Sequence, residues 1–528
     1  MTAAPTYIQV LLPVKLRWIP TYSAETPLQA GRRVCVELGR KRYDGVVWRT
    51  LERPDLPPER IQPIVAVQDE LPCVTSEELR FWEFLANYYL CTLGEVYKAA
   101  YPLLKLRSEQ TAADMLARLQ QRLARKEEQL AGKHGERVMQ RLSAERDALQ
   151  AQLAACRAQS GSADKPGRPA APGKPLVLTA ATRRKHYLPA LREALAAGRQ
   201  ALVLTPEIAF CDRLEAQLAP EFGQQLLVFH SGKTPVRRRA AAETLRRGAP
   251  AIVLGTRSAL FLPYRDLGLV IVDEEQDAAY KQTDPAPRYH GRDAAIALAD
   301  IHGARVLLGA AVPSLETLLN VRLGKYILAD APTAPSAELI DLPAERRKNG
   351  LHGIFSRKLI DAIRQTDGPV LLLRGWEKPE SLQDEITALF PDRPVRVTTL
   401  NALKREGAAG AALLAVLQAD ALVSRDDFRA DERAAQIVGT LCQFAPRVII
   451  QTALPARFDA SRGTDTLLDE RRQFGFPPYT RLVEIRRQGT GEVVDRHFLP
   501  RDRSLAARKA SLAAALPAGT YPDVDPLD

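Results

Sequence analysis

The chain has 528 residues, of which 46% are hydrophobic and 26% are charged, values that are ordinary for soluble globular proteins. They exclude a fully disordered chain, a collagen and a disulfide scaffold, and the length favours several domains. Lysines and arginines number 74 against 63 acidic residues, so the formal net charge is +11. This excess favours a polyanionic partner. Nucleic acid is favoured over a membrane, because no segment supplies about 20 continuous apolar residues.

The six cysteines are scattered, and no two stand at C-x-x-C spacing. We therefore expect no zinc site and no disulfide framework. The N-terminal segment has a short apolar run without a preceding basic region or a cleavage site. It predicts the first strand of a domain rather than a signal peptide, and we expect a cytoplasmic protein.

Residues 1–105 predict a small β-rich domain. Strand-like runs occupy 7–14, 33–38 and 43–48, and the last two are joined by Gly39, Arg40, Lys41 and Arg42. Residues 77–89 have helical periodicity, with Leu79, Trp82, Leu85 and Tyr89 on one face. We expect these four side chains to pack in a core.

Residues 106–158 predict a helical hairpin. Leucines recur there every seven residues, and a Gly-Lys-His-Gly break at 132–135 separates the two halves. Basic side chains on these helices suit either a solvated face or a phosphate contact, and the interspersed glutamates favour the solvated face. Residues 159–175 are rich in Pro, Gly, Ser and Ala and predict a flexible linker.

From residue 176 onward, short apolar β-rich runs alternate with helical stretches, which is typical of parallel sheets covered by helices. We expect one such lobe over residues 176–332 and a shortened second lobe over 333–455. A small C-terminal domain would follow over 456–528. The predicted class is therefore α/β.

The most informative stretch is 270–276, Val-Ile-Val-Asp-Glu-Glu-Gln. A buried strand there delivers Asp273 and Glu274 at its carboxyl end, where open α/β sheets bind ligands. In a nucleoside triphosphatase the first carboxylate holds Mg²⁺ and the second orients or deprotonates the attacking water. An acidic strand end without a ligand is the alternative.

Further polar segments follow the predicted strands. Those of the first lobe occupy 204–209, 229–232, 255–261, 279–282, 287–290 and 308–314. In this order and spacing they resemble the first motor lobe of the PriA family of bacterial replication-restart helicases. Segments 11–22, 30–47 and 81–102 resemble that family's DNA 3′-end-binding domain, and the resemblance returns at 427–433 and 470–479.

The resemblance implies two RecA-like helicase lobes, recognition of forked or branched DNA and of single-stranded DNA, and ATP-dependent 3′ to 5′ unwinding with Mg²⁺. It also implies primosome or helicase-loading partners, single-stranded-DNA-binding protein, and a nucleoid-associated location in bacteria. Asp273 would hold Mg²⁺, Glu274 would activate water, and Gln276 would bridge the lobes. The candidate DNA contacts are Gly39, Arg40, Lys41, Arg42, Arg257, Tyr280, Lys281, Arg288, Tyr289 and His290.

The chain departs from the family at the nucleotide site. The family's phosphate loop is glycine-rich and ends in Gly-Lys-Thr, because glycines let backbone N–H groups face the phosphates. Residues 178–186 contain no glycine here, and Thr182, Arg183 and Lys185 are the remaining candidates for a nucleotide contact. The family's Ser-Ala-Thr is replaced by Ala-Ala-Val at 310–312, and no arginine stands at 439–444, where an arginine finger is expected.

Three hypotheses follow from the sequence. The first is an active ATP-dependent DNA helicase of the PriA type. The second is a fork-binding scaffold whose motor no longer hydrolyses ATP, which recruits partners. The third is a degraded gene product that does little. The joint loss of the phosphate cradle, the coupling hydroxyls and the arginine finger favours the second, since an arginine finger alone is worth about 10³ to 10⁵ in rate.

Overall fold

A computed structural model of the protein describes most of residues 6–104 and 173–527. It omits 55, 70, 180–182, 331–336, 376–378, 424–426 and 460–462. The hairpin predicted over 106–158 and the linker predicted over 159–175 lie outside the described residues, apart from isolated positions and 173–175. The described residues fall into two compact units. One comprises 6–12, 19–74 and 101–104, and the other comprises 13–18, 75–100 and 173–527.

The first unit is built on an antiparallel sheet of five strands in the order β2-β1-β4-β3-β5. The strands predicted within 7–14, 33–38 and 43–48 are therefore present, whereas the predicted span 1–105 also includes residues 13–18 and 75–100, which belong to the other unit. Valines and isoleucines that alternate along the strands, such as Ile8, Val10, Val34 and Val36, form its core. The strands are β1 (Thr6–Leu11), β2 (Thr21–Ala24), β3 (Arg33–Leu38), β4 (Lys41–Leu51) and β5 (Ala66–Val67).

Two helices follow, α1 (Ser76–Tyr89) and α2 (Leu93–Leu104). A capping box starts α1: the Thr75 hydroxyl accepts a hydrogen bond from the backbone N–H of Glu78, and the Glu78 carboxylate accepts one from the backbone N–H of Thr75. The apolar face predicted for this helix is buried, with Trp82 stacked on Tyr97 at a centroid distance of 5.6 Å. The expectation that these aromatic side chains pack in a core is confirmed.

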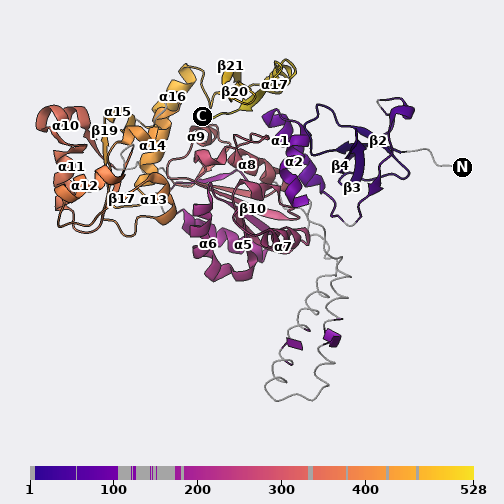
Figure 1. The fold of residues 1–528 in the computed structure, drawn as a ribbon, viewed down its shortest axis with the longest axis horizontal. Helices are drawn as coiled ribbons and strands as arrows, with labels where there is room; N and C mark the ends of the chain where they lie inside the picture. The colour runs from indigo at the N-terminus through magenta and orange to yellow at the C-terminus, as the bar shows by residue number, and fades with distance from the viewer. Residues whose placement is uncertain are drawn as a thin grey trace. The chain divides into compact units, whose positions relative to one another are not determined.

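The second unit contains two parallel sheets, which confirms the predicted α/β class (Figure 1). The first lobe has seven strands in the order β12-β6-β11-β10-β7-β9-β8, so β10 lies inside the sheet between β11 and β7. Its strands are β6 (Leu176–Leu178), β7 (Gln200–Leu204), β8 (Leu226–Phe229), β9 (Ile252–Gly255), β10 (Leu267–Asp273), β11 (Arg305–Gly309) and β12 (Ile327–Leu328).

Helices cover both faces of this sheet. Apolar side chains of α5 and α6 pack on one face, and α8 packs on β10 and β11 from the opposite side (Figure 1). The helices of the lobe are α5 (Arg184–Ala196), α6 (Ile208–Phe222), α7 (Pro235–Arg246), α8 (Gly291–His302) and α9 (Leu315–Arg322).

The second lobe has a five-stranded parallel sheet in the order β13-β19-β18-β16-β17, with an apolar cluster on each face. Its strands are β13 (Glu338–Asp341), β16 (Val370–Leu373), β17 (Val395–Thr398), β18 (Leu413–Val416) and β19 (Arg447–Thr452), beside the small pair β14 (Leu351–His352) and β15 (Phe355–Ser356). Its helices are α10 (Leu342–Asn349), α11 (Arg357–Gln365), α12 (Pro379–Leu389), α13 (Leu400–Glu406), α14 (Ala430–Leu441) and α15 (Pro455–Phe458).

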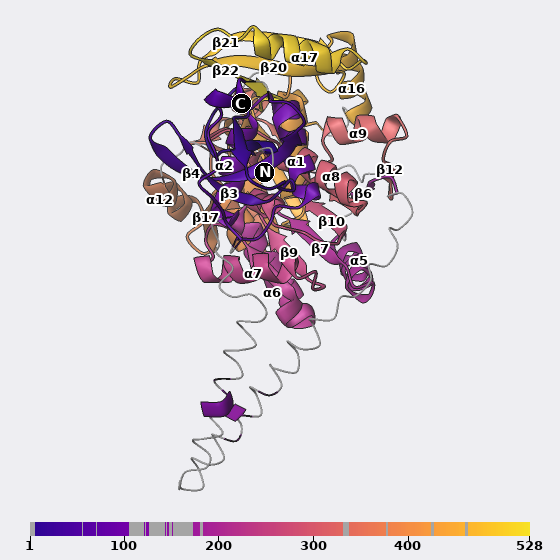
Figure 2. The same ribbon diagram turned by 90° about the vertical axis from the view of Figure 1, so that its right-hand side faces the viewer.

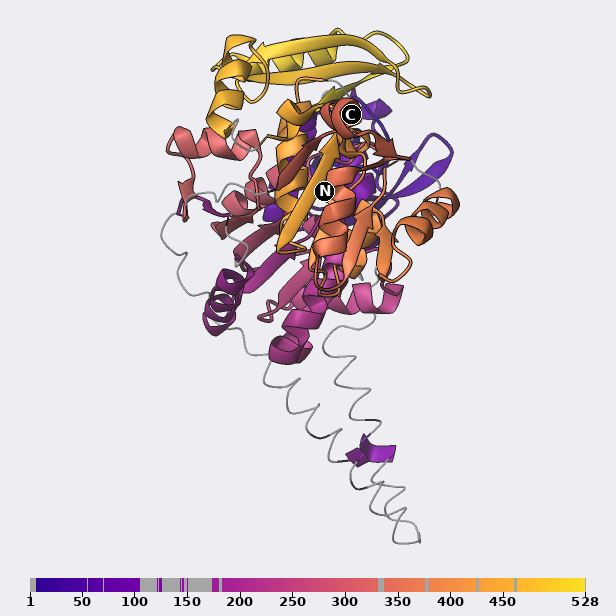
Figure 3. The same cartoon turned by 90° about the vertical axis from the view of Figure 1, so that its left-hand side faces the viewer.

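After the second lobe come helix α16 (Thr464–Gln473) and a three-stranded antiparallel sheet in the order β21-β20-β22, with helix α17 (Leu505–Ala514) (Figures 2 and 3). The strands are β20 (Thr480–Arg487), β21 (Val493–Pro500) and β22 (Thr520–Val524). Across the described part of the chain, no helix has the length and apolar character that crossing a bilayer requires.

Candidate functional site

The two carboxylates that the sequence singles out lie together at the carboxyl end of β10. Asp273 is 1% exposed and Glu274 is 4% exposed. Glu274 has a φ of 53°, a left-handed conformation that costs an L residue about 1–2 kcal/mol. Backbone outliers of this kind cluster at functional sites. The strand end is therefore built to hold these two side chains in a fixed place.

The side chain of Arg183 lies between the two carboxylates. Its Nε donates to Asp273 Oδ1 at 3.1 Å, and its Nη2 donates to Glu274 Oε1. Its third nitrogen, Nη1, donates to Gln443 Oε1 of the second lobe at 2.9 Å. The guanidinium is 1% exposed. The sequence predicted Arg183 as a phosphate contact. Its guanidinium instead donates its hydrogen bonds to protein groups.

Two neighbours complete the coordination of Asp273. Arg184 donates to Oδ2 from Nε at 3.2 Å and from Nη2 at 3.1 Å, and the Tyr187 hydroxyl donates to Oδ1 at 3.0 Å. The tyrosine fits because residue 309, across the strand end, is glycine: a Cβ there would lie 1.9 Å from the Tyr187 hydroxyl. Because Gly309 has no Cβ, Tyr187 and Arg183 can pack against its backbone and reach Asp273.

The charges of the cluster balance, with two guanidinium groups against two carboxylates. Burial would raise the pKa of Asp273, but Arg183 and Arg184 outweigh burial and hold that pKa below its usual range. Burial raises the pKa of Glu274, and Arg183 opposes that rise. Burial also opposes ionisation of Arg183, but Asp273 and Glu274 outweigh burial and raise the pKa of the guanidinium. The cluster is therefore neutral without any added cation.

These residues do not fit a magnesium nucleotide. Mg²⁺ takes oxygen ligands in a near-octahedral shell, and the Asp273 oxygens already accept hydrogen bonds from Arg183, Arg184 and Tyr187. Thr182 lies outside the described residues, and Lys185 is exposed in the first turn of α5. Among the described residues, no group of three or more His, Cys, Asp or Glu side chains is placed to hold a metal.

The next residues along the loop join the site to the rest of the fold. Gln276 donates from Nε2 to Glu274 Oε2 at 2.9 Å. Glu275 is fully buried and accepts hydrogen bonds from the Ser314 N–H at 2.7 Å, from the Ser314 hydroxyl at 3.0 Å and from Arg292 at 2.9 Å. Sequence reasoning missed Glu275, Ser314 and Arg292. Two features of the sequence could have indicated these residues: the acidic run 273–275, and the Pro-Ser pair at 313–314 before α9.

The loop from Tyr280 to His290 was expected to stack on bases. Tyr280, Tyr289 and His290 are instead 0%, 2% and 6% exposed. The Tyr280 hydroxyl lies 2.7 Å from the Asp273 carbonyl oxygen, and burial lowers the pKa of His290 to about 3, so that its imidazole is neutral. Their rings are covered by protein, and stacking on DNA would require this loop to rearrange.

The two cations expected in that loop bind the C-terminal sheet. Lys281 is buried and pairs with Asp523 of β22 at 2.7 Å, while the Arg288 guanidinium lies 3.7 Å from the centroid of Tyr521. Phosphate contacts by these two side chains would therefore compete with contacts inside the protein. Arg257 differs, because its Nη1 is buried and finds no hydrogen-bond partner among the described residues.

The N-terminal candidates remain accessible. Gly39 has a φ of 64° in the turn between β3 and β4, and a Cβ at this position would meet nothing within 4 Å. Arg40, Lys41 and Arg42 are exposed around this turn. The structure thus presents three cations beside an open glycine, and their contact with DNA stays a prediction.

A cavity of about 670 Å³ lies apart from the carboxylate cluster, among α1, α8, α9 and the C-terminal sheet. Its lining includes the aromatic side chains of Phe84 and Tyr88 and the basic side chains of Arg80, Lys174 and Arg501. Five cationic side chains line the cavity against three carboxylates, which are Asp293, Asp300 and Glu316. An apolar lining with an excess of cations suits a ligand that carries both apolar and acidic groups.

The fold thus combines two parallel-sheet lobes, a pair of strand-end carboxylates and an N-terminal β domain in one chain. Residues 9–102 match the family model of the PriA 3′ DNA-binding domain. The chain is therefore similar to the PriA replication-restart family, which is the resemblance that its motifs predict.

Curated replication restart proteins are similar to parts of this chain. Replication restart protein PriA of Bacillus subtilis is 33% identical over 195 residues, which is 36% of this chain and 24% of that protein. The Haemophilus influenzae protein is 39% identical over 193 residues, or 35% and 26% of the two chains. The Rickettsia prowazekii protein is 27% identical over 367 residues, or 67% and 51%. The chain therefore spans between a quarter and a half of the relatives it matches.

Solved structures give weaker likenesses. The structure of RecG bound to a three-way DNA junction has 11% identity and a TM-score of 0.33, and it covers 57% of this chain and 41% of that one. The Escherichia coli DExH-box NTPase HrpB has 14% identity and a TM-score of 0.35, with 55% and 40% covered.

We predict that Arg183→Ala lowers the free energy of unfolding by about 3 kcal/mol, because it leaves two buried carboxylates with one guanidinium. Urea denaturation followed by circular dichroism measures this loss. The matched control is Arg192→Ala on α5, the helix that begins directly after Arg183, because the Arg192 side chain is 60% exposed and pairs with Glu221. An equal effect of the two substitutions would contradict a role for Arg183 in neutralising the cluster.

Proposed function

We propose that this chain binds forked or branched DNA during replication restart, in the bacterial nucleoid, and that it does so without hydrolysing ATP. The observation that carries the proposal is the buried Arg183 guanidinium between Asp273 and Glu274. The relatives' name, replication restart protein, and the matched DNA-binding domain support the DNA side of it. The chain would act as a scaffold at the fork.

An active ATP-dependent helicase is the alternative. Hydrolysis would need Asp273 to hold Mg²⁺ and Glu274 to reach a water, and both carboxylates are engaged by arginine. Expelling Arg183 would also move a guanidinium that spans to Gln443 in the second lobe. Freeing the carboxylates would therefore break several charged hydrogen bonds together, at about 1.5–3 kcal/mol each.

A scaffold at the fork must also bind partner proteins. The family resemblance implies helicase-loading proteins and single-stranded-DNA-binding protein. The cavity of about 670 Å³ is lined by the aromatic side chains of Phe84 and Tyr88 and by the exposed cations Lys174 and Arg501. We propose that this cavity receives an acidic, partly apolar segment of such a partner.

The deciding experiment for ATP is a calorimetric titration of Mg²⁺-ATP, together with an ATPase assay with and without forked DNA. We expect no saturable binding at millimolar nucleotide and no DNA-stimulated turnover, because the ligand positions are filled by side chains of the chain. Micromolar, Mg²⁺-dependent binding with turnover would overturn the scaffold hypothesis. Fork binding measured in the same buffer checks that the sample is folded.

We predict that charge reversal of Arg40, Lys41 and Arg42 to glutamate weakens fork binding and flattens its salt dependence. Loss of three phosphate contacts lowers the slope of log K against log salt by about 2.7. Reversal of Arg346, Arg347 and Lys348 in α10 is the control, because it changes the net charge equally at another exposed site. Equal slopes for the two variants would remove the N-terminal turn from the DNA interface.

We predict that Lys174→Glu weakens capture of purified single-stranded-DNA-binding protein by about tenfold, as expected for loss of one charged contact. Fork affinity should be unchanged. Lys348→Glu, which alters an exposed lysine outside the cavity, is the control. Biolayer interferometry measures both affinities. If the two variants bind the partner equally well, the cavity is not the docking site.

A further inference from the structure

Within the described part of the chain, the two lobes of the second unit contact each other through protein groups at three places. The first lobe comprises the described residues between 173 and 330, and the second comprises those between 337 and 459. The three places are the N-terminus of α9, the C-terminal end of α14 with the loop after it, and the pair of helices α6 and α13. Each contact is complete without a nucleotide.

At the first place, the second lobe caps a helix of the first. Glu432, in the first turn of α14, accepts a hydrogen bond from the backbone N–H of Leu315 at 3.0 Å, and Glu316 pairs with Arg429 at 3.2 Å. Burial opposes ionisation of Glu316, but Arg429 and Arg292 outweigh burial and lower its pKa to about 2. A carboxylate at a helix N-terminus is favoured by the unpaired N–H groups there.

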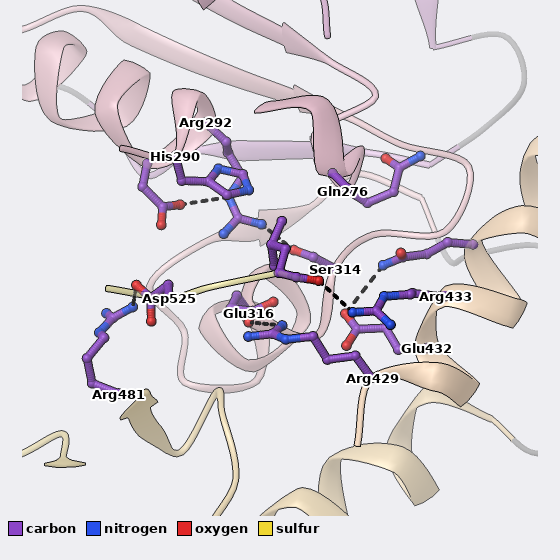
Figure 4. Close-up of a pocket in the computed structure, with 14 residues that line it drawn as sticks. Gln276, His290, Arg292, Ser314, Glu316, Arg429, Glu432, Arg433, Arg481 and Asp525 are labelled. Atoms are coloured by element: carbon purple, nitrogen blue, oxygen red, sulfur yellow. Dashed lines mark hydrogen bonds and ion pairs between the residues drawn. The ribbon is translucent and has the colours of Figure 1, made fainter. Parts of the chain in front are cut away.

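Helix α16 strengthens this contact. Arg471 donates to the other oxygen of Glu432 at 3.0 Å, and Leu467 and Leu468 of α16 pack against leucines of α9. The charged side chains surround a cavity of about 60 Å³ (Figure 4), which has room for about two waters. At this place the space beside the lobe contact is therefore small and lined by ion pairs.

At the second place, the backbones come close. A Cβ on Gly439 of α14 would lie 2.5 Å from Val312 Cγ2 and 3.6 Å from Ala311 Cβ. The apolar residues that stand where the family has coupling hydroxyls thus pack directly on the second lobe. Beside them, Gln443 accepts from Arg183 at 2.9 Å and joins the carboxylate cluster to the second lobe.

At the third place, Lys404 of α13 pairs with Asp277 of the first lobe at 2.7 Å. Arg213 of α6 donates to the Lys404 carbonyl oxygen at 3.0 Å. Lys404 and Asp277 side chains are only 15% and 12% exposed, so this pair is poorly screened by solvent. The Lys404 ammonium also lies 5.9 Å from the centroid of the Phe210 ring of α6, so this contact joins α13 to the first lobe.

We infer that these three contacts hold the lobes permanently closed, so that the pair of lobes is one rigid, nucleotide-independent body. A ligand changes a conformation only through its different affinities for the two states. Here the lobes are joined by Arg183 with Gln443, by the Leu315 N–H with Glu432, and by Lys404 with Asp277, and none of these bonds needs a nucleotide. The inference rests on the proposed loss of ATP use, but it concerns motion rather than chemistry.

The test measures the distance between the lobes in the full chain. Spin labels are attached through keto-bearing residues introduced at the exposed positions Gln224 and Asp392, and pulsed electron paramagnetic resonance reads the distance distribution. We expect one narrow distribution that is the same with and without Mg²⁺-ATP. A shift or a new population on adding Mg²⁺-ATP would overturn the inference.

A wedge tests the interface itself. Gly439→Leu puts a side chain against Val312 and, because leucine favours helix over glycine, does not weaken α14. We expect a longer, broader distance distribution and about tenfold faster hydrogen exchange at the Leu315 amide, whose bond to Glu432 is lost. Thr440→Leu, one residue along, should change neither, since its hydroxyl bonds to the Gln436 carbonyl oxygen within α14. An unchanged distance in the wedge variant would overturn the inference.

Lys404→Ala provides a second variant that leaves α14 intact, and it should broaden the distances less than the wedge does. If the distance distribution is broadened in neither variant, these contacts do not hold the lobes closed. The outcome is separable from the proposed function. If ATP is hydrolysed while the distance stays unchanged, the scaffold proposal is wrong and the inference of permanently closed lobes stands. If ATP is not hydrolysed but the lobes move freely, the scaffold proposal stands and the inference of closed lobes is wrong.

Discussion

The fold of the second unit depends on neutralising two carboxylates at a buried strand end. Asp273 and Glu274 are almost fully buried at the end of β10, where unpaired negative charge would cost several kcal/mol. A cation must therefore be present in the folded state. The chain supplies it with Arg183, whose guanidinium reaches both side chains, and Gly309 leaves the space that the neighbouring Tyr187 occupies.

A guanidinium fixed to the chain behaves differently from a metal nucleotide. Mg²⁺-ATP arrives, reacts and leaves, so the charge at the strand end and the contacts across the lobes change during each cycle. Arg183 is part of the chain, so it does not dissociate as a ligand does. Because Glu275 holds Ser314 and the next residue, Leu315, is capped by Glu432 of the second lobe, the same strand end is tied to the lobe contact. Permanent neutralisation and permanent closure are thus two consequences of one arrangement.

The sequence predicts the parts of this structure that depend on local pattern. Apolar β-rich runs indicated the parallel sheets, and the strand-end position of Asp273 and Glu274 indicated the site. The missing glycines at 178–186 indicated a lost phosphate loop, but a pattern cannot show that Arg183 folds back onto the carboxylates 90 residues away. The loop from Tyr280 to His290 resembles a DNA contact, whereas Lys281 binds Asp523 of a strand more than 200 residues later. Such pairings are non-local, and only the tertiary fold reveals them.

The distribution of basic residues also separates interior from surface roles. Arg183, Arg292, Arg429 and Arg471 are buried and each is matched by carboxylates, so they contribute nothing to a field outside the protein. Among the described residues, the turn from Arg40 to Arg42 is one concentrated group of exposed cations. Counterion release makes DNA affinity depend on accessible cations alone. A chain that uses its buried arginines for internal closure can still bind DNA through its surface, with no need for the motor to move.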